Sequence, residues 1–261
     1  DNWGKPFFTL LSSPFSQFGF KGIVFFNIIC GILTSFFAFQ IVKELKYTYS
    51  YLACVFVTFS QYYFMMHLTA LTEILFGLML VISIFLALKN KYILSAILLS
   101  FLPFVRNEGF MVFPFFFFYF ISNKQYQKVT FMLTGFITYS IIGYFYYNDF
   151  LWVIHLNPYM NSTYGNGSYF HFLNKLNVVS GIPLLILAIC GFLLLVYHSV
   201  NTKKKEIFSE QLKAEWLLIV LPFMAYFFFH SYLWGKGIGG SLGLLRVMVG
   251  VAPLASIISL K

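Results

Sequence analysis

The sequence predicts an all-α polytopic membrane protein of about nine membrane segments, and three observations support this. First, of its 261 residues 60% are hydrophobic and 22% aromatic, whereas only 10% are charged; a soluble domain is about 25% charged. Second, long apolar runs are separated by short polar stretches, as in helical membrane proteins. Third, the basic residues that give the net charge of +9 stand between apolar runs and form no basic face. This pattern favours membrane lipids as partners and excludes nucleic acid.

The chain reads as one transmembrane domain over residues 1–261, and it begins and stops as a piece of a longer protein would. Residues 1–21 are predicted to lie in the membrane interface, because Pro6 and Pro14 interrupt any continuous span there. Residues 148–177 are predicted to form a long outer loop. The nine expected segments are Ile23 to Val42, Tyr51 to Met66, Ile74 to Leu88, Tyr92 to Val105, Phe110 to Ile121, Val129 to Tyr147, Val178 to Val200, Trp216 to His230 and Ser241 to Leu260.

Two of these segments form a short-armed hairpin around the sequence Arg106-Asn107-Glu108-Gly109. At about 1.5 Å per residue the first arm spans roughly 21 Å, less than the ~30 Å of a hydrocarbon core. The apex would therefore lie below the membrane surface, where an Arg or Glu costs about 2.5–3.5 kcal/mol. Gly109 allows the backbone to turn, so Arg106 and Glu108 are expected to converge with Glu73 in a polar site. A short solvated loop is the alternative.

Alternating the nine segments across a membrane sorts the basic residues into two unequal sets. The larger set contains Lys43, Lys46, Lys89, Lys91, Lys124, Lys128, Lys203, Lys204, Lys205, Lys213 and Lys261, and the smaller contains Lys5, Lys21, Arg106, Lys175, Lys236 and Arg246. The positive-inside rule places the larger set in the cytoplasm. The polar stretches around Glu73, Arg106 and Arg246 then share the outer face.

Three residues on that face are candidates for chemistry. Arg246 lies inside the last apolar run, where an arginine indicates function by default and its fork suits a phosphate; a snorkelling anchor is the alternative. Glu73 opens an apolar run, where a carboxylate either complements the helix dipole or binds a sugar hydroxyl. His67 precedes it and is either an interfacial histidine or a partner of Glu73. The three cysteines lie in apolar runs without metal-ligand spacing.

Several short motifs occur in an order that resembles the GT-C glycosyltransferases, which are membrane enzymes that use polyprenyl-phosphate sugars. They are Lys5-Pro6 after a Trp and a Gly, Thr72-Glu73 at a span start, Arg106-Asn107-Glu108-Gly109, and Arg246 followed by Pro253. The likeness is greatest to bacterial mannosyltransferase-like and aminoarabinose-transferase-like members. It implies a bacterial inner-membrane protein whose site faces the periplasm or exterior.

The resemblance also implies roles for individual residues. Lys5 and Arg246 would bind the donor phosphate, and His67, Glu73, Arg106 and Glu108 would shape the sugar or acceptor pocket. The family's catalytic Asp belongs to a loop that would precede residue 1, so the general base is expected upstream. Some members use a divalent metal, Mg²⁺ or Mn²⁺, although no metal ligands are assigned in this chain.

The sequence is also compatible with two other functions. One is a transporter or flippase for a lipid-linked sugar, in which the buried charges form a translocation path. The sequence has no internal repeat, which weighs against a transporter built from duplicated halves. The other is a polysaccharide polymerase or ligase, which also uses lipid-linked sugars.

Overall fold

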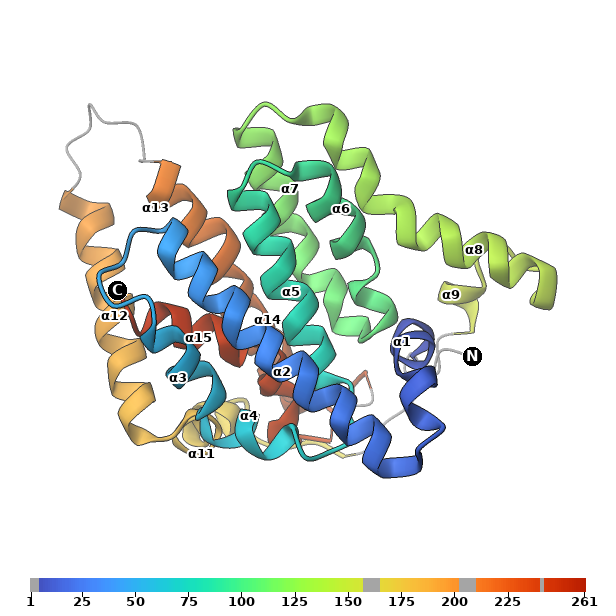
Figure 1. The fold of residues 1–261 in the computed structure, drawn as a ribbon, viewed down its shortest axis with the longest axis horizontal. Helices are drawn as coiled ribbons and strands as arrows, with labels where there is room; N and C mark the ends of the chain where they lie inside the picture. Colours follow the sequence, from blue (N-terminus) through green and yellow to red (C-terminus); the bar gives the residue numbers. More distant parts are fainter. Residues whose placement is uncertain (1–4, 157–164, 202–209, 240–241) are drawn as a thin grey trace.

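The computed structural model describes residues 5–156, 165–201, 210–239 and 242–261, and within these ranges the chain is helical and contains no strand (Figure 1). The all-α prediction is therefore confirmed for this part of the chain. Its elements are α1 (Pro6–Ser16), α2 (Gly19–Glu44), α3 (Leu52–Thr58), α4 (Gln61–Met66), α5 (Glu73–Leu88), α6 (Tyr92–Ser100), η1 (Leu102–Phe104), η2 (Asn107–Val112), α7 (Phe113–Ser122), η3 (Tyr126–Leu133), α8 (Thr134–Tyr147), α9 (Trp152–His155), α10 (His171–Asn174), α11 (Leu176–Ser180), α12 (Ile182–Asn201), α13 (Glu210–Ala214), η4 (Glu215–Val220), α14 (Leu221–Lys236), η5 (Leu245–Val251) and α15 (Ala252–Ile258).

Four helical segments among the described residues are long and apolar enough to cross a membrane, so the prediction of nine segments is not supported. The four are Gly19–Glu44, Tyr126–Tyr147, Ile182–Asn201 and Glu210–Lys236. The expected span from Tyr51 to Met66 is divided, because Ser60 leaves the helical region with φ −57° and ψ 122°. The last expected span is likewise a short 3₁₀ helix, η5, followed by the short α15.

Helix α5 is the centre of the bundle, and α2, α6 and η5 pack around it (Figure 1). Twelve of its 16 residues are buried, from Glu73 at its start to Ala87 near its end. A helix that is apolar on every side must be covered either by neighbouring protein or by lipid, and here neighbouring helices cover it. The position of α5 therefore fixes Glu73 at the end of the protein core.

Among the described residues, the loops at 45–51, 89–91 and 123–125 lie at one end of the bundle, and the loop at 67–72 lies at the other (Figure 1). We call the first the lysine-rich end; there Lys89 binds Glu44, and Lys213 donates a hydrogen bond to Asn123. At the other end, the site end, Asn27 donates hydrogen bonds to the carbonyls of Thr69 and Leu71, just before α5 begins. In Figure 1 the lysine-rich end is uppermost, and α4 and α11 lie near the site end.

Part of the stretch predicted as an outer loop is folded against the protein. Trp152 in α9 is buried and donates a hydrogen bond from Nε1 to the carbonyl of Tyr139 in α8, at 2.7 Å. Phe172 in α10 is also buried. Residues 157–164 of this loop lie outside the described residues.

Candidate functional site

A largely buried ion-pair network surrounds Arg106 at the site end. Its Nη1 lies 2.7 Å from Oε1 of Glu73, and its Nη2 lies 2.8 Å from Oε1 of Glu108. Nη1 also donates a hydrogen bond of 3.2 Å to the hydroxyl of Thr72. The side chain of Glu73 is 1% exposed and that of Arg106 is 12% exposed. The expected convergence of these three charged side chains is therefore confirmed by the distances.

The local backbone explains how residues two positions apart meet. Arg106 is extended, with φ −152° and ψ 132°, and the 3₁₀ helix η2 begins directly after it. In a regular α-helix residues i and i+2 point in different directions. Gly109 lies so close to the carbonyl carbon of Leu102 that a Cβ would meet it at 2.7 Å. The glycine therefore permits the tight turn that returns Glu108 to Arg106.

Arg246 joins the same network from η5. Its Nε lies 3.6 Å from Oε1 of Glu73, so Glu73 stands between two guanidinium groups. The side chain of Arg246 is 39% exposed. The sequence suggested that Arg246 lies a few residues inside a helix, but η5 begins at Leu245. Arg246 therefore stands at a helix start, where its side chain can reach both Glu73 and a ligand from outside.

Lys5 lies on the other side of the network, next to η2. Its Nζ donates a hydrogen bond of 3.2 Å to Oδ1 of Asn107. Burial lowers the pKa of Lys5 to about 8, although Glu108 opposes this change; Arg106 adds to it. Lys5 thus gives up its proton more easily than a lysine in water, while it remains charged at neutral pH.

Two residues of α14 complete the site, and they are not among the site residues that the sequence predicts. His230 is buried, and its Nε2 lies 3.8 Å from Oε1 of Glu108. The ring of Tyr226, fully buried, lies 4.6 Å from the ring of His230. Their spacing of four residues within an apolar run places them on one helix face, which is the signal that could have found them.

The charges in this network favour an anionic ligand. Burial alone would raise the pKa of Glu108, but the adjacent Arg106 and His230 lower it to about 2, so this carboxylate stays ionised. Three cations (Lys5, Arg106 and Arg246) face two carboxylates (Glu73 and Glu108), which leaves one net positive charge. Anchored guanidinium groups in a partly buried site bind phosphate or carboxylate oxygens well.

His67 lies apart from this network, although the sequence grouped it with Glu73. It is buried against α2, where its Nε2 occupies the space that a Cβ on Gly31 would need. Its ring lies edge-on to Tyr63, with the centroids 4.7 Å apart. Among the described residues no ion pair links His67 to Glu73 or Arg106. These contacts are typical of a packed core histidine.

The described residues do not fit a divalent metal. They contain no group of three or more His, Cys, Asp or Glu side chains placed to hold one. The two carboxylates of the network, Glu73 and Glu108, both turn an oxygen toward Arg106.

Comparisons with protein-family models, with curated proteins and with solved structures found no match to this chain.

Proposed function

We propose that this chain forms the membrane domain of a glycosyltransferase, which moves a sugar from a polyprenyl-phosphate-linked donor to a lipid, glycan or protein acceptor. The observation that carries the proposal is the position of Glu73 between Arg106 and Arg246, at one end of an apolar helical bundle. This arrangement places a site for an anion at the end of an apolar helical bundle, where a membrane lipid can approach it. The resemblance of the short motifs to GT-C enzymes supports the same function.

In the proposed reaction, an acceptor hydroxyl attacks the anomeric carbon of the donor sugar. A general base, which the resemblance to GT-C enzymes implies, takes the hydroxyl proton, and the bond between the anomeric carbon and the phosphate oxygen breaks with its electron pair on the oxygen. The leaving phosphate gains negative charge, which Arg246 and Lys5 stabilise. Arg106 does not move in this scheme, because Glu73, Glu108 and Thr72 hold it on three sides.

Glu73 has three roles in this proposal. It orients Arg246 by contacting Nε of the guanidinium group. The two terminal nitrogens of this partly exposed group are then left to face the donor phosphate. It also balances charge, since two guanidinium groups without a carboxylate between them would repel each other. The carboxylates Glu73 and Glu108 then shape the pocket for the sugar or the acceptor.

We further propose that the site end faces the periplasm or exterior of a bacterial inner membrane. The lysine-rich end then lies in the cytoplasm, in agreement with the positive-inside rule. The four long apolar helices support the membrane part of this proposal.

The test is sugar transfer by the full-length protein in proteoliposomes supplied with a radiolabelled polyprenyl-phosphate sugar. A transferase releases polyprenyl phosphate and labels an acceptor, and Glu73→Gln should reduce both. A flippase would move the intact donor to the opposite leaflet without cleaving it. Translocation without cleavage by the parent protein would replace the transferase with the transporter.

A further inference from the structure

His171, the first residue of α10, contacts the stretch of backbone that carries Arg246. Its Nε2 lies 2.8 Å from the carbonyl oxygen of Gly243, which is 72 residues further along the chain. A carbonyl oxygen only accepts, so Nε2 carries the proton and donates this hydrogen bond. Gly243 precedes Arg246 by three residues, and η5 begins between them at Leu245. The bond therefore ties α10 to the start of η5.

Gly243 is suited to this contact, because its backbone is left-handed and lies against an aromatic ring. Its φ is +62°, and a Cβ at this position would meet the ring of Trp234 at 2.7 Å. Both features favour glycine. The ring of His171 also packs near Trp234, with the centroids 5.9 Å apart. His171, Trp234 and Gly243 therefore form one packed junction between α10, α14 and the chain that enters η5.

The chain on both sides of His171 is itself held on α14. Before it, the backbone N–H of Gly167 donates a hydrogen bond of 3.1 Å to the carbonyl of Trp234. After it, Phe172 is buried, and its ring lies 6.1 Å from the ring of His230. His171 is therefore anchored to a long helix, and it can serve as a fixed point for a segment that lacks one.

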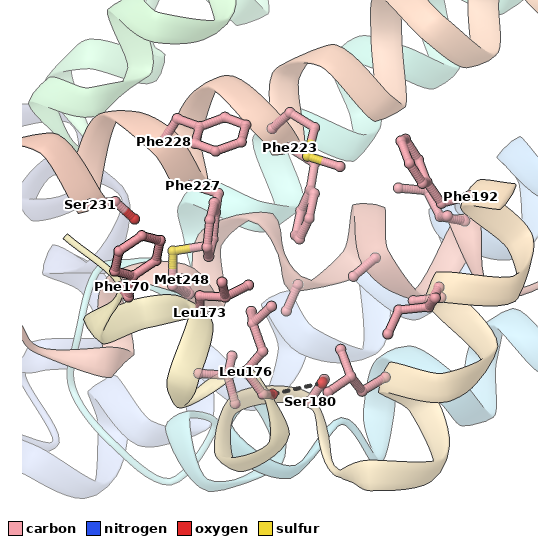
Figure 2. Close-up of a pocket in the computed structure, with 18 of the residues that line it drawn as sticks. Phe170, Leu173, Leu176, Ser180, Phe192, Phe223, Phe227, Phe228, Ser231 and Met248 are labelled. Carbon is pink, nitrogen blue, oxygen red and sulfur yellow. Dashed lines mark hydrogen bonds between the residues drawn. The ribbon is translucent and has the colours of Figure 1, made fainter. Parts of the chain in front are cut away.

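An apolar cavity borders both elements next to this junction. Phe170 and Leu173 line it near His171, and Met248 lines it from η5 (Figure 2). Side chains that line a cavity have fewer packing contacts than those in a filled core. The hydrogen bond from His171 therefore has a larger share in fixing where η5 begins.

Arg246 depends on this support, because its side chain has few contacts of its own. Among the described residues its one charged partner is Glu73, and the 3.6 Å between Nε and Oε1 exceeds a hydrogen-bond distance. The guanidinium of Arg106, in contrast, lies within 2.8 Å of two carboxylates. The place of the Arg246 guanidinium is therefore set mainly by the place of its backbone.

We propose that His171 is a positioning residue for Arg246, which it holds beside Glu73 through the carbonyl of Gly243. The proposal rests on the proposed function only for what Arg246 binds, the phosphate of the donor. His171 acts through the backbone of η5 and not by contact with that phosphate.

The first measurement requires no donor. Hydrogen–deuterium exchange of the full-length protein in nanodiscs reports how firmly residues 242–251 are held. His171→Ala should raise the exchange rate at the start of η5 about fivefold, the equivalent of one hydrogen bond of ~1 kcal/mol. His171→Gln still offers an N–H to the same carbonyl and should keep the parental rate. His155→Ala is the matched control, because His155 is 59% exposed and pairs with Asp149.

The second measurement is the affinity of the same variants for a polyprenyl-phosphate sugar. His171→Ala should weaken donor binding about fivefold, and His171→Gln should restore it. In an Arg246→Ala background, His171→Ala should have no further effect, because a residue that acts through another loses its influence when that residue is removed.

The outcomes separate this proposal from the proposed function. Parental exchange at residues 242–251 in His171→Ala would overturn the proposal, and so would an equal loss of donor affinity with and without Arg246. If exchange rises as expected but the parent protein binds no polyprenyl-phosphate sugar, the proposed function fails and the role of His171 in holding η5 stands.

Discussion

Arg106 and Glu73 form a buried ion pair, 2.7 Å between Nη1 and Oε1, at the first residue of the central helix α5. A carboxylate at a helix N-terminus is favoured by the helix dipole, and here it also meets a guanidinium from a separate hairpin. Since both side chains are largely buried, neither can be removed without leaving its partner unpaired. The pair therefore sets both the stability and the geometry of the site end.

The first prediction concerns that pair. Arg106→Met leaves Glu73 and Glu108 without their main cation and should lower the free energy of unfolding by about 3–5 kcal/mol. Adding Glu73→Gln to this variant should recover part of the loss, because it removes one unpaired charge. Reversible unfolding in detergent or bicelles measures both values. Additive losses in the double variant would show that the two residues do not interact.

The second prediction concerns pH. Burial lowers the pKa of Lys5 to about 8, and only the protonated form attracts a phosphate. Donor affinity should therefore be full below this pKa and fall as the pH rises through it. Lys5→Arg keeps its charge at all these pH values and should abolish the fall. Donor binding measured from pH ~6 to ~10 tests this, and an identical pH profile in the variant would contradict it.

The third prediction concerns a second buried pair near the lysine-rich end. Glu215 is 1% exposed and accepts hydrogen bonds from Lys261, Tyr47 and Gln211. Lys261→Met should cost about 3–5 kcal/mol, because it leaves a buried carboxylate without its cation.

The exposed pair between Lys89 and Glu44 is the matched control for this experiment, with side chains 42% and 30% exposed. Lys89→Met should change the stability by no more than about 1 kcal/mol, since solvent screens surface pairs. Equal losses for the two lysine variants would refute the distinction between the pairs.

The fourth prediction concerns His67 and Gly31. A Cβ at position 31 would overlap the imidazole, so Gly31→Ala should cost about 1–3 kcal/mol through overpacking. Adding His67→Ala should return most of this stability by making room. Gly77→Ala serves as a control, because its Cβ would meet its nearest neighbour at 3.4 Å. Thermal unfolding compares the variants, and a stable Gly31→Ala would disprove the tight packing.

The sequence predicted the charged residues at the centre of the site better than the residues that surround them. Glu73, Arg106 and Glu108 could be grouped, because short hairpin arms and Gly109 restrict where these charges can lie. His230 and Tyr226 could not, since their role depends on which face of α14 meets η2, and that is decided by tertiary packing. His67 was misgrouped because nearness in sequence to Glu73 does not fix the face on which it packs.

The number of membrane segments shows a similar limit. Apolar composition indicated that residues 51–66 and 241–260 belong in the membrane or the core, but it could not show where the helix breaks. Ser60 interrupts the first of these runs, and the second contains two short helices, η5 and α15. A count based on hydropathy therefore overestimates the segments long enough to span a bilayer.

The most direct test of the central claim is sugar transfer by Arg246→Lys in the full-length enzyme. Lysine keeps the charge but loses both the fork and the Nε contact with Glu73. The proposed function predicts a fall in donor affinity and turnover of at least about tenfold, the equivalent of one charge-assisted hydrogen bond, with unchanged membrane insertion. Lys236→Ala, which removes an exposed cation near the site end, should have little effect. Near-parental transfer and donor affinity in Arg246→Lys would contradict the role of Arg246 as the phosphate ligand.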